Sequence, residues 1–468
     1  MNGSLIERID SEIDGYTARL SADTIKLVNI KSVLSEALPG APFGEGPRRV
    51  LDAFMKMADE DGFYVTDYGV GVVSAAMKPT EADLGIWIHG DVVHEGDGWS
   101  FPPYDATEYK GCIIGRGATD NKGQLAAILG LFRIFKRLGV ELSYNPAIYL
   151  GSNEENGKHD VIGVEGNPDA RGFINVHKPP RLSLVPDGSF PVGYGGKGSL
   201  NITLTAKNPI KDYTFVAGLP ESPGKATAVF FSRDIPESIE KCTVSRGACN
   251  EISAFSPPVH GAHPDPCGNM ITFLSSALLD NGLIPEGDRP MFEFLCDVSK
   301  MVYGESLGIA KEHDVMGRLT VTSKSVRCIN GYLSFDINIR YPIGTTFEEL
   351  TDKISESAEA AGFKMTSAKQ YTRPYMNERD NEVVRMLCEV SNEVTGESKK
   401  PYTLSGGTYA HELPNAYVFG TDGNKPPEDF PEGRGGAHGI DEAVSLDRLK
   451  RAMKIYARAL IKLNDIEW

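Results

Sequence analysis

Residues 86–123 read IWIHGDVVHEGDGWSFPPYDATEYKGCIIGRGATDNKG and contain the pattern that decides the fold. They begin with an apolar run that predicts a buried strand, and His89 and Asp91 lie at the end of this run. Because alternate residues of a strand point to the same side, both side chains can leave the strand end together. Asp120 follows a polar loop rich in glycine and proline, and it precedes an amphipathic run, residues 125–135, that predicts a helix.

An imidazole at a strand end and a carboxylate at a helix start are suitable ligands for one metal site. In this hypothesis His89 binds the metal directly, and Asp91 holds the other ring nitrogen of that histidine. Two simpler explanations compete with it. The HxD pair can arise by chance, and an Asp before a helix often does no more than cap it. The HxD pair alone favours the simpler explanations, whereas the whole stretch favours a metal site.

Length and charge limit the classes of protein to consider. A chain of 468 residues with 41% apolar and 24% charged residues predicts a soluble globular protein of two or three domains. The net charge of −16 argues against nucleic-acid and anionic-membrane partners, which require basic surfaces. Seven scattered cysteines without a CxxC pair are typical of reduced thiols, and the N-terminus has no apolar signal segment. We therefore expect a cytoplasmic protein.

Further apolar strands are followed by acidic residues. Residues 147–151 lead into Glu154 and Glu155, and residues 182–185 lead into Asp187. Paired acids can be a solvated turn, and a lone Asp before Gly is more often a turn residue than a ligand. Strands that alternate with helices and end in polar residues nevertheless predict an α/β sandwich with its site along one sheet edge.

The pattern changes near residue 195. Two similar amphipathic strands, residues 198–208 and 331–342, are each followed by a stretch with helical spacing, residues 224–233 and 346–361. This predicts a doubled β-α-β unit, although an unrelated insertion with ordinary strand patterning is the alternative. We expect a catalytic domain in two parts, residues 1–195 and 376–468, with an inserted α+β domain at residues 196–375.

Taken in order along the chain, the motifs HGDVVHEGDGW, GRGATDNKG, the Glu154-Glu155 pair, LVPDGS and AHGIDE resemble those of one family. This is the aminoacylase/carnosinase family of dinuclear zinc metallopeptidases, in particular its peptidase V-type dipeptidases. The resemblance extends over almost the whole chain. It implies a zinc-peptidase-like α/β catalytic domain with an inserted, doubled α+β lid domain that covers the site of a monomer.

The resemblance also assigns roles to residues. It implies two divalent ions, zinc with manganese or cobalt as alternatives. Asp120 would bridge both ions and be followed by a cis peptide bond. Glu154 would be the general base that activates a metal-bridging water. The implied metal ligands are His89, Asp120, Glu155, Asp187 and His438.

Five more residues have candidate roles in substrate binding or catalysis. His260 matches the family's lid histidine, an oxyanion stabiliser, with His263 as a rival and a surface-loop histidine as the simpler explanation. Arg340 matches an arginine that binds the substrate carboxylate, although an exposed strand arginine is nearly as plausible. The turn at Ser405, Gly406 and Gly407 resembles one that offers backbone donors to the same carboxylate.

These observations predict a metal-dependent dipeptidase that hydrolyses short unblocked peptides. Its partner is a small peptide, with no nucleic acid and no membrane. The alternatives are an N-acyl amino acid deacylase of the same family and a peptide-binding homologue that has lost catalysis. The second alternative predicts decay at the base or the ligands, but Glu154 and all the implied ligands are present.

Overall fold

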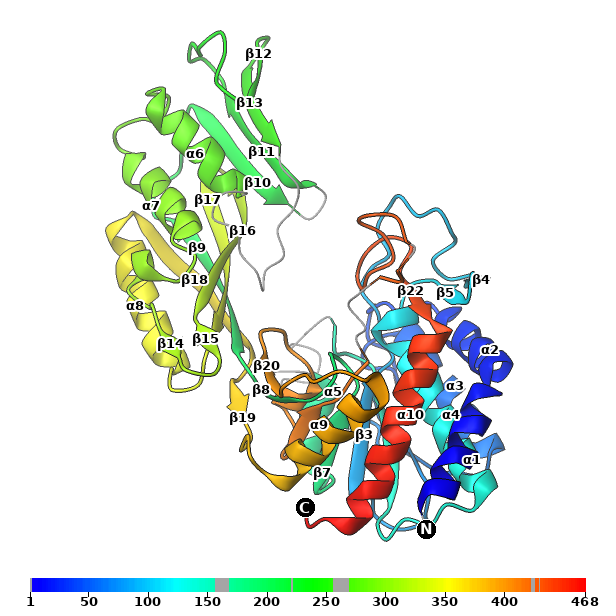
Figure 1. Cartoon of the computed structure of the whole chain (residues 1–468). Coiled ribbons are helices and arrows are strands. Elements are labelled where there is room, and N and C mark those ends of the chain that lie inside the picture. Colours follow the sequence, from blue (N-terminus) through cyan, green and yellow to red (C-terminus); the bar gives the residue numbers. More distant parts are fainter. Residues whose placement is uncertain (1, 156–167, 220–221, 256–268, 422–425, 429) are drawn as a thin grey trace. The chain divides into compact units, whose positions relative to one another are not determined.

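The computed structural model describes residues 2–155, 168–219, 222–255, 269–421, 426–428 and 430–468 (Figure 1). The chain divides into two compact units. Unit 1 contains residues 1–195, 376–403 and 408–468, and unit 2 contains residues 196–375 and 404–407. Each unit has its own hydrophobic core.

Unit 1 is built on a nine-stranded mixed sheet. Its four central strands run parallel, and antiparallel strands flank them. The order across the sheet is β1 (Tyr64–Asp67), β2 (Val72–Ala76), β6 (Pro146–Gly151), β3 (Leu84–His89), β7 (Leu182–Val185), β21 (Ala416–Val418), β8 (Gly193–Gly196) and β19 (Tyr375–Met376), with β20 (Tyr402–Leu404) beside β8. The central strands are buried along their whole length, as expected of parallel strands covered on both faces.

Helices cover both faces of this sheet. Ile86 and Ile88 of β3 belong to the main core, whereas Trp87 points to the opposite face and stacks on Tyr149 of β6. Phe173 packs against both rings with T-shaped geometry. The helices of unit 1 are α1 (Asn2–Asp14), α2 (Thr17–Val28), α3 (Glu45–Glu60), α4 (Gly123–Leu138), α5 (Pro168–Val176), α9 (Glu382–Thr395) and α10 (Leu446–Lys462). Of these, α5 supplies Phe173, and α4 and α10 contribute many residues to the main core (Figure 1).

The contact between α4 and its neighbours depends on a glycine. A Cβ at Gly130 would lie 2.6 Å from the Tyr16 ring and 3.3 Å from Met453, so only glycine lets the helices approach this closely. The helix ends at Gly139, which has φ +63° and provides a left-handed cap. A second, three-stranded sheet joins β22 (Ala443–Ser445), β5 (Cys112–Ile114) and β4 (Thr107–Tyr109).

Unit 2 is an eight-stranded antiparallel sheet. Its order is β12 (Thr243–Ser245), β13 (Asn250–Phe255), β11 (Ser222–Phe230), β10 (Tyr213–Leu219), β16 (Thr320–Ile329), β17 (Tyr332–Tyr341), β9 (Gly198–Ala206) and β18 (Phe363–Thr372). Among the described residues of unit 2, three helices pack on this sheet: α6 (Met270–Asp280), α7 (Arg289–Lys300) and α8 (Phe347–Ala360) (Figure 1). A two-stranded ribbon joins β14 (Glu312–His313) and β15 (Gly317–Arg318).

The prediction of one helix in unit 2 is wrong. Residues 224–230, expected to begin a helix, belong to strand β11, which pairs with β10 and β13. Ala226, Ala228 and Phe230 alternate into the core of unit 2, which is the period of a strand. The second expected helix, residues 346–361, corresponds to α8. In the part of the chain that the structure describes, no helix is long and apolar enough to cross a membrane.

Candidate metal centre and active site

The carboxyl ends of three neighbouring parallel strands supply most of the candidate site. His89 is the last residue of β3, Glu154 and Glu155 follow the end of β6, and Asp187 follows β7. Because β3 pairs with both β6 and β7, these side chains meet at one edge of the sheet. This is the edge at which open α/β sheets bind their ligands.

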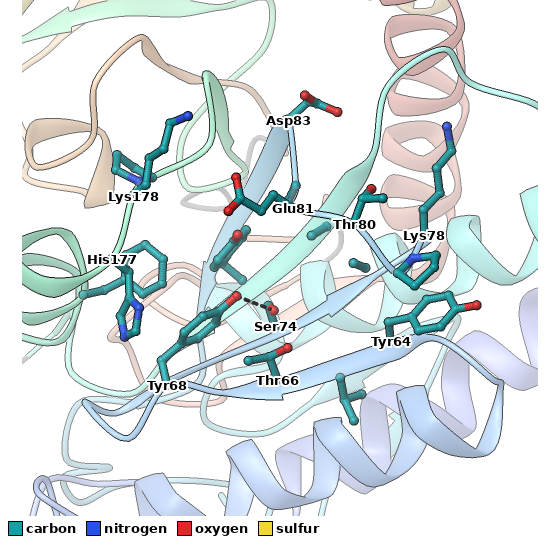
Figure 2. A pocket seen from close by; sticks show the side chains of 18 of the residues that line it. Tyr64, Thr66, Tyr68, Ser74, Lys78, Thr80, Glu81, Asp83, His177 and Lys178 are labelled. Carbon is teal, nitrogen blue, oxygen red and sulfur yellow. Dashed lines mark hydrogen bonds between the residues drawn. The ribbon is translucent and has the colours of Figure 1, made fainter.

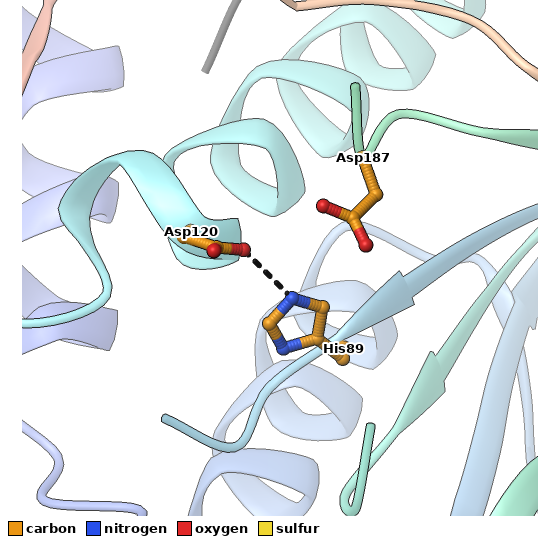
Figure 3. Close-up of side chains that lie close together, drawn as sticks. All are labelled: His89, Asp120 and Asp187. Carbon is orange, nitrogen blue, oxygen red and sulfur yellow. Dashed lines mark hydrogen bonds and ion pairs between the residues drawn. The ribbon is translucent and has the colours of Figure 1, made fainter. Parts of the chain in front are cut away.

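The first group of donors contains His89, Asp120 and Asp187, which offer ligand atoms within 4.8 Å of one another. Figure 3 shows the three side chains, with Nε2 of His89 lying 2.9 Å from Oδ1 of Asp120. His89 is 1% exposed. The ring is therefore fixed inside the protein and points at the two carboxylates.

The second group contains Asp120, Glu155 and His438, again within 4.8 Å. Nε2 of His438 lies 2.8 Å from Oε1 of Glu155 and 3.2 Å from Oδ2 of Asp120. Asp120 thus uses one oxygen toward each histidine. Two groups of three donors that share one carboxylate have the composition expected for a pair of divalent ions.

The donor set fits metal ions on electrostatic grounds as well. Burial and the charge of Asp120 raise the pKa of Asp187 to about 7, and the same two causes raise the pKa of Glu155. Several carboxylates that repel one another at a buried edge require positive charge between them. Divalent cations would supply that charge.

Hydrogen bonds of the backbone fix the position of Asp120, and its side chain does not cap the following helix. It lies in the turn η1 (Ala118–Lys122), and the peptide bond that follows it is cis. The amides of Thr119 and Asp120 donate to Oε1 of Glu442, at 3.0 and 3.1 Å. The start of α4 has no side-chain cap, so the Asp120 carboxylate remains directed at the two histidines.

Asp91 contacts both His89 and the Glu154-Glu155 turn. Nδ1 of His89 lies 3.1 Å from the carbonyl oxygen of Asp91 and 3.6 Å from its Oδ1. The amides of Glu154 and Glu155 donate to the two carboxylate oxygens of Asp91, each at 3.0 Å. Asp91 therefore orients the histidine mainly through its backbone and orients the acidic turn through its side chain.

The surroundings of both histidines favour the protonated ring. Burial lowers the pKa of His89, but hydrogen bonds to Asp120 and Asp91 outweigh it and hold the pKa well above the usual value. Burial likewise opposes protonation of His438, whose contacts with Asp120 and Glu155 raise its pKa to about 11. The pKa of Asp120 falls well below its usual range, because the two histidines outweigh its burial.

Metal binding at pH 7 should therefore release protons. Metal ligands must be deprotonated, so the two histidines should release about two protons per fully loaded molecule. The protonated fractions of Asp187 and Glu155, whose pKa values are raised, add to this number. Calorimetric titration of chelator-treated protein with Zn²⁺, in buffers of different ionisation enthalpy, measures this number. Since these pKa values are raised, apparent affinity should increase as pH rises from 6 to 8. Proton release near zero would contradict the ligand assignment.

The other predicted site residues lie elsewhere or are not described. Arg340 lies on β17, where its Nε donates to Oδ1 of Asn338 at 3.1 Å. The turn at residues 405–407 belongs to unit 2, and a Cβ on Gly407 would lie 3.1 Å from Thr372. Thr372 and Arg340 both pair with Ser199 of β9. His260 lies outside the described residues, as does its rival His263.

A buried ion pair that the sequence motifs did not predict joins two of them. NH1 of Arg116 lies 2.6 Å from Oε2 of Glu442, and both side chains are 1% exposed. The other terminal nitrogen of Arg116 donates to the carbonyl oxygens of Glu95 and His438, each at 3.2 Å. The sequence offered one indication of this pair, which is that both charged residues lie inside or beside glycine-containing motifs.

A separate depression in unit 1 lies near the amino ends of the parallel strands (Figure 2). Tyr68 stacks on Tyr149 there and forms a 3.1 Å hydrogen bond with Ser74. The metal-site candidates lie at the opposite, carboxyl ends of the same strands. The depression is therefore distinct from the candidate active site.

Comparison with known proteins decides the family. A sequence model of Peptidase family M20/M25/M40 matches residues 85–462, which is most of the chain. The chain belongs to this family. It is a family of hydrolytic metallopeptidases, so the predicted recognition of a metallopeptidase is confirmed.

Three relatives illustrate the family likeness. A provisionally named dipeptidase of Staphylococcus saprophyticus is 27% identical over 97% of this chain and 98% of its own. Human carnosine dipeptidase 1 has a similar fold, with a TM-score of 0.61, 15% identity and 99% coverage of both chains. A di-peptidase of Saccharomyces cerevisiae gives a TM-score of 0.60 at 14% identity, again with 99% coverage of both chains. The predicted fold class of this M20/M25/M40 member, α/β with an inserted α+β unit, is confirmed.

Proposed function

We propose that this protein is a metal-dependent dipeptidase that hydrolyses short unblocked peptides. The observation that carries the proposal is the pair of donor groups sharing Asp120, with the carboxyl of Glu154 next in sequence to the ligand Glu155. Membership of a metallopeptidase family and the dipeptidase names of its relatives support the reaction and the class of substrate.

We assign His89 and Asp187 to one divalent ion, Glu155 and His438 to the other, and Asp120 to both. Zinc suits this set of imidazoles and carboxylates, and manganese or cobalt are the alternatives. Bound there, the ions supply Lewis acidity, which polarises the scissile carbonyl and makes water more acidic.

Glu154 is the proposed general base. Burial and the nearby charge of Asp187 raise its pKa well above the usual value, so this carboxyl can hold a proton near neutral pH. It takes a proton from the attacking water and delivers it to the leaving amine as the peptide C–N bond breaks. Asp91 keeps the base in place through the amides of Glu154 and Glu155.

Unit 2 is proposed to be the lid that binds the ends of the substrate. Arg340 would pair with the substrate carboxylate, and the amides at Ser405, Gly406 and Gly407 would donate to it. His260 is the proposed oxyanion stabiliser. The proposed protein is a monomer in which this lid closes over its own site, and the free thiols of the described cysteines support a cytoplasmic location.

Turnover with restored metal tests the function. Chelator-treated protein, supplied with zinc, manganese or cobalt, should cleave dipeptides and leave tripeptides and N-acetyl amino acids largely intact. Cleavage chiefly of N-acetyl amino acids would instead assign the protein to the deacylase branch. Absence of turnover with all three metals and all three substrate types would favour the peptide-binding alternative.

Replacing Arg340 by Met should raise KM for free dipeptides by about 10- to 100-fold and change kcat little, because a charged hydrogen bond to the substrate is lost. Dipeptide amides lack the carboxylate, so their KM should be similarly high with the wild-type protein and the variant. Arg327, on the neighbouring strand β16, is paired with Asp336 and provides the matched control Arg327→Met. An equal loss on free and amidated substrates would contradict the carboxylate role.

A further inference from the structure

The turn that carries Glu154 and Glu155 is held by a second buried carboxylate, on a different element from Asp91. Asp169 lies in the first turn of α5 and is fully buried. Its Oδ2 accepts hydrogen bonds from the amides of Ser152 and Asn153, at 2.7 and 2.8 Å. Two carboxylates thus bind four successive amides, Asp169 the first two and Asp91 the next two.

The same oxygen of Asp169 also accepts a 2.6 Å hydrogen bond from the hydroxyl of Tyr409. Tyr409 lies in the short helix η3 (Tyr409–His411), is 1% exposed and packs edge-on against Trp87. Oδ1 of Asp169 accepts from the amide of Ala170 at 2.7 Å. All four of these hydrogen-bond donors belong to buried residues, an arrangement that fixes the position of the carboxylate closely.

The end of β6 leaves room for this arrangement. A Cβ at Gly151 would lie 2.0 Å from the Tyr409 hydroxyl and 2.5 Å from Oδ2 of Asp169. Only glycine at this strand end allows the hydroxyl and the carboxylate to reach the turn. Burial, together with the charge of Asp91, raises the pKa of Asp169 to about 6.

We infer that Asp169 and Tyr409 are positioning residues for the active site: they orient the Ser152–Glu155 turn and, through it, the base and one metal ligand. The inference rests on the proposed roles of Glu154 and Glu155. Oδ2 accepts two adjacent amides and a hydroxyl, and Oδ1 accepts the Ala170 amide. Asn has only one acceptor oxygen, so its NH₂ group would face either the Ala170 amide or the three donors on Oδ2. Asp169→Asn should therefore loosen the turn without removing any group that touches substrate.

The expected result for Asp169→Asn is a fall in kcat of about 10- to 100-fold, with KM within about twofold of wild type. Zn²⁺ affinity should fall by a similar factor, because Glu155 is less well placed. Tyr409→Phe removes one hydrogen bond and keeps the ring, so it should lower kcat in the same direction by about threefold to tenfold.

A measurement that does not depend on catalysis can distinguish a positioning role from a general effect on stability. Amide hydrogen exchange of wild-type and variant protein, followed by mass spectrometry without metal, should be about tenfold faster at residues 152–155 in Asp169→Asn and unchanged in β6. Asp23→Asn is the matched control, since Asp23 is a buried carboxylate of α2 paired with Arg133. It should lower Tm without changing exchange at residues 152–155 or Zn²⁺ affinity.

The inference is overturned if Asp169→Asn folds and leaves both exchange at residues 152–155 and Zn²⁺ affinity at wild-type values. If that variant fails to fold, unchanged exchange and affinity in Tyr409→Phe overturn it equally. Failure of the proposed function is distinguishable, because wild-type protein would then cleave no peptide while the exchange and metal-binding differences persisted.

Discussion

Replacing Glu154 by Gln should lower kcat for dipeptides by about 10²- to 10⁴-fold, the range typical for loss of a general base. The substitution keeps the shape of the side chain and removes its ability to accept the proton of the attacking water. The backbone amide of Glu154 still donates to Asp91, so the turn should keep its position. Metal content measured by mass spectrometry should therefore equal that of wild type.

The adjacent acid provides the matched comparison. Oε1 of Glu155 lies 2.8 Å from His438, in the second donor group, so Glu155→Gln should lose metal as well as activity. Excess Zn²⁺ should partly restore Glu155→Gln and should leave Glu154→Gln inactive. If Glu154→Gln retains more than about a tenth of wild-type kcat, another group is the base.

Removing one partner of the buried Arg116–Glu442 pair should lower the free energy of unfolding of unit 1 by about 3–5 kcal/mol. Arg116→Met leaves the Glu442 carboxylate buried without its cation, and burial already raises the pKa of Glu442 despite Arg116. It also deprives the His438 carbonyl of a donor. Loss of the ion pair should therefore weaken metal binding along with stability.

Denaturation in urea, followed by tryptophan fluorescence, isolates the effect, because Trp87, Trp99 and Trp468 all belong to unit 1. The double variant Arg116→Met/Glu442→Gln should lose less than the sum of the single losses, because no lone buried charge remains. Lys56→Met, in the exposed pair with Glu60, should change stability by no more than about 0.5 kcal/mol. Additive losses in the double variant would contradict an energetic coupling between the two side chains.

The sequence predicts best where a local pattern decides the structure. The terminal helix α10 repeats apolar residues at helical spacing, and the carboxylates that follow β6 and β7 are recognised by their place after apolar runs. The order of motifs along the chain, from His89 to His438, is enough to identify the family, and the family model spans both residues.

What the sequence could not supply depends on partners far apart in the chain. Asp169 resembles an ordinary acid in the first turn of a helix, and only the fold brings Tyr409 onto it, 240 residues later. The segment of strand β11 has helical spacing, and its pairing with β10 and β13, which overrides local preference, cannot be seen in the segment alone. Sequence patterns therefore do not predict the conformation where tertiary contacts, and not the spacing of apolar residues, determine it.

The discontinuity of unit 1 has a consequence for synthesis. Arg116 and Glu442 are 326 residues apart, and the whole of unit 2 is made between them. A growing chain can complete the sheet of unit 2 while unit 1 still lacks β21, His438 and α10. Unit 1 is therefore started before unit 2 and completed after it. The proposed metal ligands can come together only after translation has passed residue 438.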